Sequence, residues 1–502
     1  MLALLPALFV IVAPPAQVPW TEEQVARGVA GLDGWAQEAL DKDYAPGLAI
    51  VVVKGDQIIY QKGFGVRSTK TSQKVDVNTV FQFASVSKSV SGTLMAALVG
   101  DKKLKWLDPV APMLPGFKLG DPWTTQHVTV RDLFSHQSGL ADHAGDLLED
   151  YGWDQAAIFQ RLHFFADPSH FRDNYEYTNF GLTVAGEGVA RKFKMTYDQL
   201  AQTRLFKPAG MNTSSFLFSD FIKRPNHADL HQRVGGKWQP NDVRDPDAQA
   251  PAGGYSGSIL DLAQYLKLHL NKGMVDGKRV IDEEALASSL VPAIVSGRSP
   301  SDGRPNFYAM GMGVSYRPDG RIYYTHSGAF DTGARSAISI CVSDGLAIGV
   351  VCNAYNGVPE AIIQYFDETI ASGKASREWF TFMNGAFQQM EDKMKEGQPD
   401  FSKPAQPFVA AKSLDVYVGE YKNDCYGKVR IVRSGNGLEL VIGPQGRRFQ
   451  LTHYSADTFT YMTPGENSIG IGGVVFVMGG VGKASQLTML PLRESSLGVF
   501  KR

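Results

Sequence analysis

Apolar residues in the first hundred positions follow two different periods. Residues 48–53 and 57–64 are short apolar runs rich in β-branched side chains, and the Gly55-Asp56 pair between them favours a tight turn, so a β-hairpin is predicted. From Ser85 to Val99 the apolar residues recur at helical spacing, and Gly100 stands where helices commonly end in a left-handed residue. The pattern therefore places Ser85 at the N-terminus of a helix.

The middle of the chain, about residues 101–252, mixes helical patterns with loops rich in Pro, Gly, Asp and Asn. We interpret it as a helical insertion in an α/β domain with an antiparallel sheet. The Asp344-Gly345 pair predicts a second hairpin, and a two-residue turn there would pair Cys341 with Ile348, so Cys341 and Cys352 should not face each other. Strands are predicted at 322–325, 336–341 and 346–352, followed by helices at 359–370 and 377–395.

A change of pattern near residue 400 predicts a second domain. Residues 396–412 are rich in proline and polar residues, which is typical of a linker. The short β-type runs beyond it predict a small β-barrel, with strands at 428–432, 438–442, 449–454 and 474–478. We therefore divide the chain into a main domain at 25–372, a helix and linker at 373–412, and a barrel at 413–502.

Composition excludes several classes of function. The 502 residues carry a net charge of −1, which provides no long-range attraction to nucleic acid or to anionic membranes. Cys341, Cys352 and Cys425 are too few for a disulfide framework, and His227 and His231 lack the glutamate of an H-E-x-x-H zinc site. The chain has neither a glycine-rich phosphate loop nor a G-x-S-x-G elbow. We expect no metal, no other cofactor and no nucleic-acid partner.

The N-terminus carries an apolar run that is too short to cross a bilayer. This run, residues 2–13, is interrupted by Pro6 and suits the core of a signal peptide at residues 1–16. Such a peptide would direct the protein to the periplasm or outside the cell. No Lys or Arg precedes the run, and no clean cleavage site surrounds Ala13 or Ala16, so a buried N-terminal segment of a cytoplasmic protein is the alternative. No integral membrane span is expected.

Residues 85–88 form the tetrad Ser-Val-Ser-Lys, an S-x-x-K pattern at the predicted helix start. Residues three apart share a helix face, so the Lys88 amine can reach the Ser85 hydroxyl. The helix dipole there favours developing negative charge. The alternative is an N-capping Ser85 with an exposed Lys88, and the tetrad alone does not decide between the two.

Two further motifs follow in order. Tyr177-Thr178-Asn179 lies in a polar loop before an apolar helix, and His326-Ser327-Gly328 follows the strand pattern at 322–325. With the tetrad they resemble the S-x-x-K, Y-x-N and K/H-x-G motifs of class C β-lactamases and the related penicillin-binding proteins, esterases and D-aminopeptidases. The resemblance covers about residues 25–372, and it extends to the segments VRDLFSHQSGL at 130–140, KPAGM at 207–211 and PAGG at 251–254.

The resemblance implies a role for each matching residue. Ser85 would be the nucleophile that forms an acyl-enzyme, while Lys88 and Tyr177 would share the proton transfer, each holding the pKa of the other low. Asn179 would orient Lys88 and the substrate amide, and His326 would donate to Tyr177 or bind a substrate carboxylate. Ser327 and Gly328 would contact the substrate. The backbone N–H groups of Ser85 and Ala329 would form the oxyanion hole.

His326 stands where true β-lactamases carry a lysine. A lysine provides a permanent charge for the carboxylate of a β-lactam, whereas histidine is largely neutral at pH 7. The resemblance therefore favours a serine hydrolase acting on peptide or amide bonds, including linear peptides with D-residues. An esterase with the same residues is one alternative, and a slowly deacylating penicillin-binding receptor or β-lactamase is another.

The segment from Leu414, with Tyr417-Val418-Gly419-Glu420-Tyr421, resembles a lipocalin-like module that some of these peptidases carry after the catalytic domain. Such a module can cover the active site or help to assemble a homo-oligomer.

Overall fold

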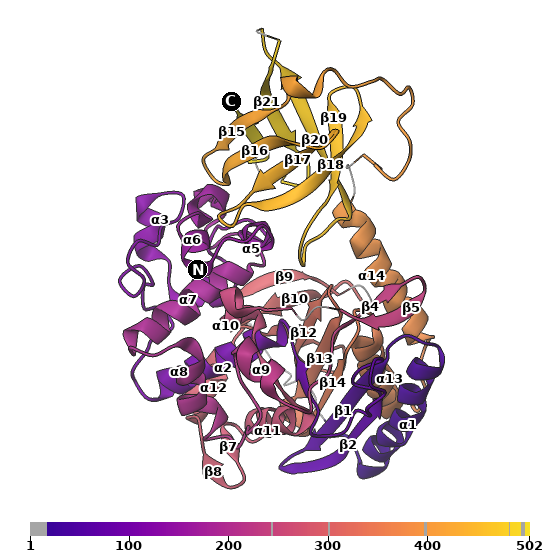
Figure 1. Cartoon of the computed structure of the whole chain (residues 1–502). Helices are drawn as coiled ribbons and strands as arrows, with labels where there is room; N and C mark the ends of the chain where they lie inside the picture. The colour runs from indigo at the N-terminus through magenta and orange to yellow at the C-terminus, as the bar shows by residue number, and fades with distance from the viewer. Residues whose placement is uncertain (1–17, 242–243, 300–301, 396–398, 481, 493–496) are drawn as a thin grey trace, which may run out of the picture.

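The computed structural model describes residues 18–241, 244–299, 302–395, 399–480, 482–492 and 497–502. The candidate signal peptide at 1–16 lies outside these residues. The chain forms a large α/β unit with a closed eight-stranded β-barrel docked on one end of it (Figure 1). The antiparallel sheet, the helical subdomain and the small barrel predicted from the sequence are confirmed. Within the described part of the chain, no helix is both long and apolar enough to cross a membrane.

The large unit is built on an antiparallel sheet of eight strands in the order β2-β1-β14-β13-β12-β11-β10-β9. The predicted hairpin at its N-terminal end is confirmed, with Gly55 and Asp56 between the two strands. The strands are β1 Gly47–Lys54, β2 Gln57–Gly65, β9 Ile294–Arg298, β10 Pro305–Tyr308, β11 Gly313–Tyr316, β12 Ile322–Phe330, β13 Ala334–Cys341 and β14 Leu346–Cys352.

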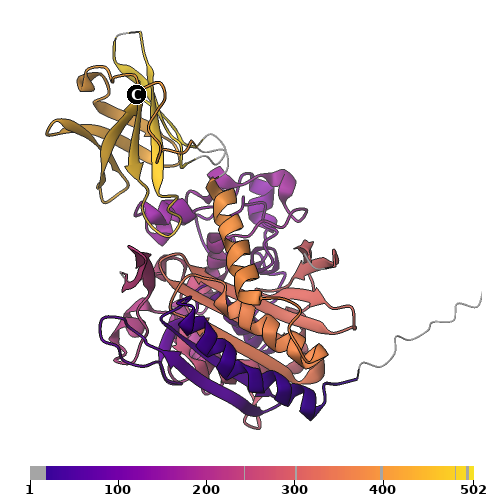
Figure 2. The same ribbon diagram turned by 90° about the vertical axis from the view of Figure 1, so that its right-hand side faces the viewer.

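Strand β1 is apolar throughout because both of its faces are covered. Ala49, Val51 and Val53 belong to one buried cluster, whereas the alternate residues Leu48, Ile50 and Val52 belong to another. Helices α1 (Glu22–Asp41) and α13 (Val358–Ser372) lie side by side on one face (Figure 2). The other face packs against helices α2 Val86–Gly100 and α11 Ile259–Leu270, and α12 Glu283–Ser289 packs against α2.

Two local predictions are wrong in detail. The β13–β14 connection is a 3-10 turn at Val342–Asp344 followed by left-handed Gly345, so Cys341 pairs with Leu346 rather than Ile348. None of the three cysteines forms a disulfide, and all three are buried. Gly100 is the last helical residue of α2 and not its left-handed cap: a Cβ there would lie 3.0 Å from the Asp282 Cβ at the start of α12. Close helix packing therefore explains this glycine.

The helical subdomain interrupts the sheet between β2 and β9 and supplies one wall of the site described below. Its helices are α3 Pro122–His127, α4 Val130–Phe134, α5 Asp146–Asp150, α6 Gln155–Phe159, α7 Asn179–Lys192, α8 Tyr197–Ala201, α9 Phe218–Lys223 and α10 Ala250–Gly253. Short strand pairs accompany them: β3 Val80–Gln82 with β6 Ser256–Ser258, β4 His231–Val234 with β5 Lys237–Pro240, and β7 Met274–Val275 with β8 Lys278–Arg279.

Helix α14 (Trp379–Lys395) runs from the sheet towards the barrel (Figure 1). Buried aromatic rings fill the barrel interior, with Tyr417 against Phe459 and Phe476 at centroid distances of 5.1 and 4.8 Å. The barrel strands are β15 Gly419–Asn423, β16 Gly427–Ser434, β17 Gly437–Ile442, β18 Arg447–Ser455, β19 Thr458–Met462, β20 Ile471–Met478, β21 Ala484–Met489 and β22 Val499–Lys501.

Candidate active site

Ser85 stands directly before helix α2, as the sequence predicts, but its side chain does not cap the helix. The structure shows no capping hydrogen bond from Ser85. The first turn is closed by the backbone, with Ser87 N–H donating to Ala84 O and Lys88 N–H to Ser85 O. Ala84 adopts a left-handed φ of 47°, which is uncommon for a residue with a Cβ and sets Ser85 on a sharp turn. The Ser85 hydroxyl is therefore left for other partners.

Lys88 is fully buried one turn into the same helix. Its Nζ lies 3.0 Å from Ser85 Oγ, 2.6 Å from Asn179 Oδ1 and 3.1 Å from the carbonyl oxygen of Ala252. Burial lowers the pKa of Lys88 to about 7, against the opposing effect of the Asp146 charge. A neutral amine fits this environment, because its two N–H groups can donate to the two carbonyl oxygens while its lone pair faces the Ser85 hydroxyl.

Tyr177 completes the group from the opposite wall. A hydrogen bond joins its hydroxyl to Ser85, and Lys88 Nζ lies over its ring at 4.6 Å from the ring centroid. The expectation of a lowered pKa is wrong for Tyr177: burial raises its pKa well above the usual value. Tyr177 therefore stays protonated near neutrality, and Lys88 is the group that can accept a proton.

Asn179, the first residue of α7, is held by a carboxylate that the sequence analysis missed. Its Nδ2 donates to Asp146 Oδ2 at 2.7 Å, which turns its Oδ1 towards Lys88. His143 contacts the same carboxylate oxygen at 2.8 Å. Burial alone would lower the pKa of His143, but the hydrogen bond to Asp146 and the charges of Asp146 and Asp142 together outweigh it and raise this pKa to about 9. Asp146 carries no signature in the sequence, because its role depends on how α5 packs beside α7.

His326 lies inside strand β12, and its partners differ from those expected. Its Nδ1 is 2.6 Å from the carbonyl oxygen of Ser327 and its Nε2 is 2.9 Å from Tyr308 Oη. The carbonyl must accept, so Nδ1 carries the proton and Nε2 accepts from Tyr308. The prediction that His326 donates to Tyr177 is wrong in this respect. Burial lowers the pKa of His326 to about 3, so the imidazole is neutral and provides no charge for a carboxylate.

Gly328 explains why the third motif needs a glycine. A Cβ at this position would lie 2.1 Å from Phe83 O and 2.8 Å from Ser85 N, so only glycine lets β12 cross the start of α2. The backbone at Gly328 thus runs beside the Ser85 N–H. Ser327 lies next in the strand, paired with Ala337 on β13. The structure therefore brings all three predicted motifs to one place.

A family profile decides the classification of this fold and site. The sequence profile described as Beta-lactamase matches residues 32–368, which is more than half of the chain. The chain belongs to the β-lactamase family. A second profile, described as a domain of unknown function (DUF3471), matches residues 403–497, and the closed barrel formed there fits a lipocalin-like domain.

Relatives of this β-lactamase-family protein include hydrolases and penicillin-binding proteins. Penicillin-binding protein 4 of Amycolatopsis lactamdurans is 28% identical over 320 residues, 62% of this chain and 81% of the relative. An unguisins hydrolase of Aspergillus campestris is 21% identical over 481 residues, 88% of this chain and 87% of the relative. The family is one of serine hydrolases with the β-lactamase and penicillin-binding-protein fold.

Solved structures show the same fold. The octameric penicillin-binding protein homologue from Pyrococcus abyssi has a TM-score of 0.60 at 20% identity, covering 94% of this chain and 100% of that chain. The class C β-lactamase from Rhodobacter sphaeroides has a TM-score of 0.56 at 20% identity, covering 67% of this chain and 97% of that chain. The first match extends through the barrel of the present β-lactamase-family protein.

His136, in the segment 130–140, is a second residue whose placement the sequence did not predict. Its ring is fully buried, its Nδ1 accepts from the Thr178 N–H at 3.1 Å, and it lies 4.6 Å from the Tyr177 ring. It thereby fixes the backbone between Tyr177 and Asn179. Over the described ranges, no group of three or more His, Cys, Asp or Glu side chains is arranged to hold a metal ion.

Proposed function

We propose that this protein cleaves peptide or amide bonds through an acyl-enzyme on Ser85. The observation that carries the proposal is the contact of Lys88 Nζ with Ser85 Oγ at 3.0 Å, made by an amine whose pKa burial lowers to about 7. An unperturbed lysine is protonated at neutral pH and cannot act as a base. The lowered pKa provides a base that is poised near the working pH.

The geometry supports a two-step reaction. In the first step Ser85 Oγ attacks the carbonyl carbon as its proton passes to Lys88 Nζ, and the Ser85 and Ala329 N–H groups stabilise the oxyanion. The protonated Tyr177 hydroxyl gives its proton to the leaving nitrogen as the C–N bond breaks, and Lys88 restores that proton. In the second step water attacks the Ser85 ester, which releases the acid and the free hydroxyl.

Two observations favour peptides or amides over β-lactams as substrates. His326 is neutral, so strand β12 does not present at this position the permanent cation that would bind a β-lactam carboxylate. The unguisins hydrolase matches 88% of the chain, which includes the barrel as well as the main domain. We extend the proposal to linear peptides, including those with D-residues.

A panel of substrates tests this assignment. We would measure kcat/KM for L- and D-peptide amides, p-nitrophenyl esters and a chromogenic β-lactam, with Ser85→Ala as the blank. The proposal predicts the highest kcat/KM, after correction for intrinsic reactivity, for a peptide or amide. Faster corrected turnover of esters alone would indicate an esterase. A penicillin adduct that persists for hours without peptide turnover would indicate a receptor.

Asp146 provides a further prediction. Asp146→Ala removes the acceptor that orients Asn179, and we expect kcat/KM to fall by about 10- to 100-fold because the Lys88 amine loses its fixed geometry. Asp146→Asn keeps an oxygen that can accept from Asn179 and removes the charge that raises the pKa of Lys88, so the acidic limb of the pH profile should move to lower pH. Exposed Asp173→Asn is the control. An unmoved limb in Asp146→Asn would contradict the assigned coupling.

A further inference from the structure

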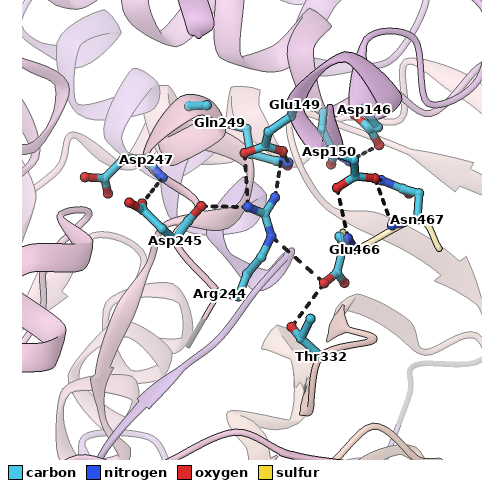
Figure 3. Close-up of polar contacts among 12 residues, drawn as sticks. Asp146, Glu149, Asp150, Arg244, Asp245, Asp247, Gln249, Thr332, Glu466 and Asn467 are labelled. Carbon is cyan, nitrogen blue, oxygen red and sulfur yellow. Dashed lines mark hydrogen bonds and ion pairs between the residues drawn. The ribbon is translucent and has the colours of Figure 1, made fainter. Parts of the chain in front are cut away.

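One loop of the barrel contacts two walls of the active site. Residues 463–470 connect β19 and β20, and we call them the barrel loop. They line a cavity of about 700 Å³ together with Gln445 and Arg447 of the barrel and with residues of the main domain. Figure 3 shows Glu466 and Asn467 of this loop pointing into a polar cluster of the main domain. The cluster joins the barrel to two different walls of the site.

The first contact is with the turn that follows strand β12. Glu466 Oε1 accepts from the Asp331 N–H at 2.6 Å, and Glu466 Oε2 lies 3.1 Å from the Thr332 hydroxyl. Asp331 comes two residues after Ala329, whose N–H is a proposed oxyanion donor. Both carboxyl oxygens of Glu466 are thus occupied at the end of the strand that crosses Ser85.

The second contact is with helix α5 in the helical subdomain. Asp150, the last residue of α5, accepts from the Glu466 N–H at 2.9 Å and from the N–H and side-chain amide of Asn467 at 3.0 and 2.8 Å. Gly465 has a φ of 83°, and a Cβ there would lie 2.0 Å from Asp150 Oδ1. The first residue of the same helix is Asp146, which holds Asn179. One five-residue helix therefore connects the barrel loop to the partner of Lys88.

Arg244 lies between Glu466 of the barrel loop and Glu149 of helix α5. Its Nε lies 3.9 Å from Glu466 Oε2, and its guanidinium donates to both Glu149 oxygens at 3.1 and 2.6 Å. It also lies over the Phe330 ring at 5.6 Å from the centroid, next to Ala329. The side chains of Arg244 and Glu466 are only 11% and 15% exposed, so water replaces these contacts poorly if one partner is lost.

We propose that the barrel loop braces the active site, with Glu466 as a positioning residue that sets the end of β12 against helix α5. The inference rests on the proposed function, because it assigns Glu466 an effect on Ser85 chemistry through the Ala329 backbone. Glu466 is not a catalytic residue, since its contacts are with the turn, Arg244 and α5. The barrel then affects turnover without touching the reacting groups. Loss of the Glu466 contacts should therefore change kcat more than KM.

The test compares two substitutions of Glu466 with a matched barrel variant. Glu466→Ala removes both acceptors, and we expect kcat to fall by about 10- to 100-fold with KM changed by less than about threefold. Glutamine keeps an amide oxygen that can accept from the Asp331 N–H and a second polar atom beside the Thr332 hydroxyl, so Glu466→Gln should retain most of kcat. Glu439→Ala removes a barrel carboxylate bound to Arg448 and should leave kcat unchanged.

Hydrogen–deuterium exchange gives a readout that does not depend on turnover. In Glu466→Ala, amides of residues 327–333 and 146–150 should exchange faster than in the parent protein, while the barrel core strands stay protected. The proposal needs both results. Unchanged exchange at these two walls, a rise in KM alone, or a loss in Glu466→Gln as large as in Glu466→Ala would overturn it. Failure of the proposed function is seen separately, as hydrolysis that persists in Ser85→Ala.

Discussion

We expect Ser85→Ala to reduce kcat/KM for the best substrate by at least about 10⁴-fold, because the substitution removes the covalent nucleophile. The hydroxyl is the group that Lys88 and Tyr177 surround, and it makes no helix cap whose loss would unfold α2. The folded structure should therefore persist, with an unchanged circular dichroism spectrum and little change in Tm. Steady-state kinetics and thermal unfolding of the same preparation measure the two quantities.

Ser89→Ala is the matched control for this substitution. Ser89 is a buried serine on the same helix, and its hydroxyl donates to the backbone oxygen of Val86 rather than to the site. Its loss should lower stability slightly and leave kcat/KM within about twofold, since it touches no reacting group. Retention of full activity by Ser85→Ala would show that another residue is the nucleophile.

Lys88→Met should lower kcat by roughly 10²- to 10⁴-fold, the usual range for loss of a general base. Methionine has a similar length and no amine, so it fills the buried position without a proton acceptor. The cost of burying the amine is relieved, which offsets the loss of its bonds to Asn179 Oδ1 and the Ala252 carbonyl oxygen, so Tm should change little. A fall in kcat with an unchanged or raised Tm therefore separates the chemical role of Lys88 from a structural one.

The pH profile gives a second readout of Lys88. Because burial holds its pKa at about 7, the amine is neutral and able to accept a proton above that pH, and protonated below it. In the parent protein, log kcat should therefore fall with unit slope as the pH decreases below about 7, provided chemistry limits the rate. A limb near pH 10 would instead show that Lys88 keeps its ordinary pKa and is protonated at neutrality.

The sequence predicts correctly those contacts that join residues close together in the chain. The i, i+3 spacing of Ser85 and Lys88 fixes their contact once the helix forms, and the Gly55-Asp56 pair sets the first hairpin. The same reasoning failed at the β13–β14 turn, since Val342–Asp344 form a 3-10 turn that lengthens the loop. The role predicted for Gly100 is wrong because this glycine is required by close contact with α12, which lies far along the chain.

Contacts that depend on tertiary packing could not be predicted from the sequence. His326 meets Tyr308 because β10 and β12 both flank β11, a relation that no motif records. Asp146 binds Asn179 at the start of α7, and His136 binds the backbone N–H of Thr178. Neither residue belongs to a sequence motif that predicts such a contact. Short β-type runs separated by turn residues predict the barrel strands, but the contact of Glu466 with the turn after β12 depends on how the two domains dock.

Mass spectrometry of a trapped acyl- or phosphonyl-enzyme tests the central claim most directly. The protein would be incubated with a fluorophosphonate or a slowly deacylating penicillin, digested with trypsin, and analysed by fragmentation of the peptide Val75–Lys88, which contains both Ser85 and Ser87. The account predicts a stoichiometric adduct on Ser85 that is lost in Ser85→Ala, together with loss of hydrolysis in step with labelling. An adduct on Ser87 or on another peptide, with Ser85 unmodified, would contradict it.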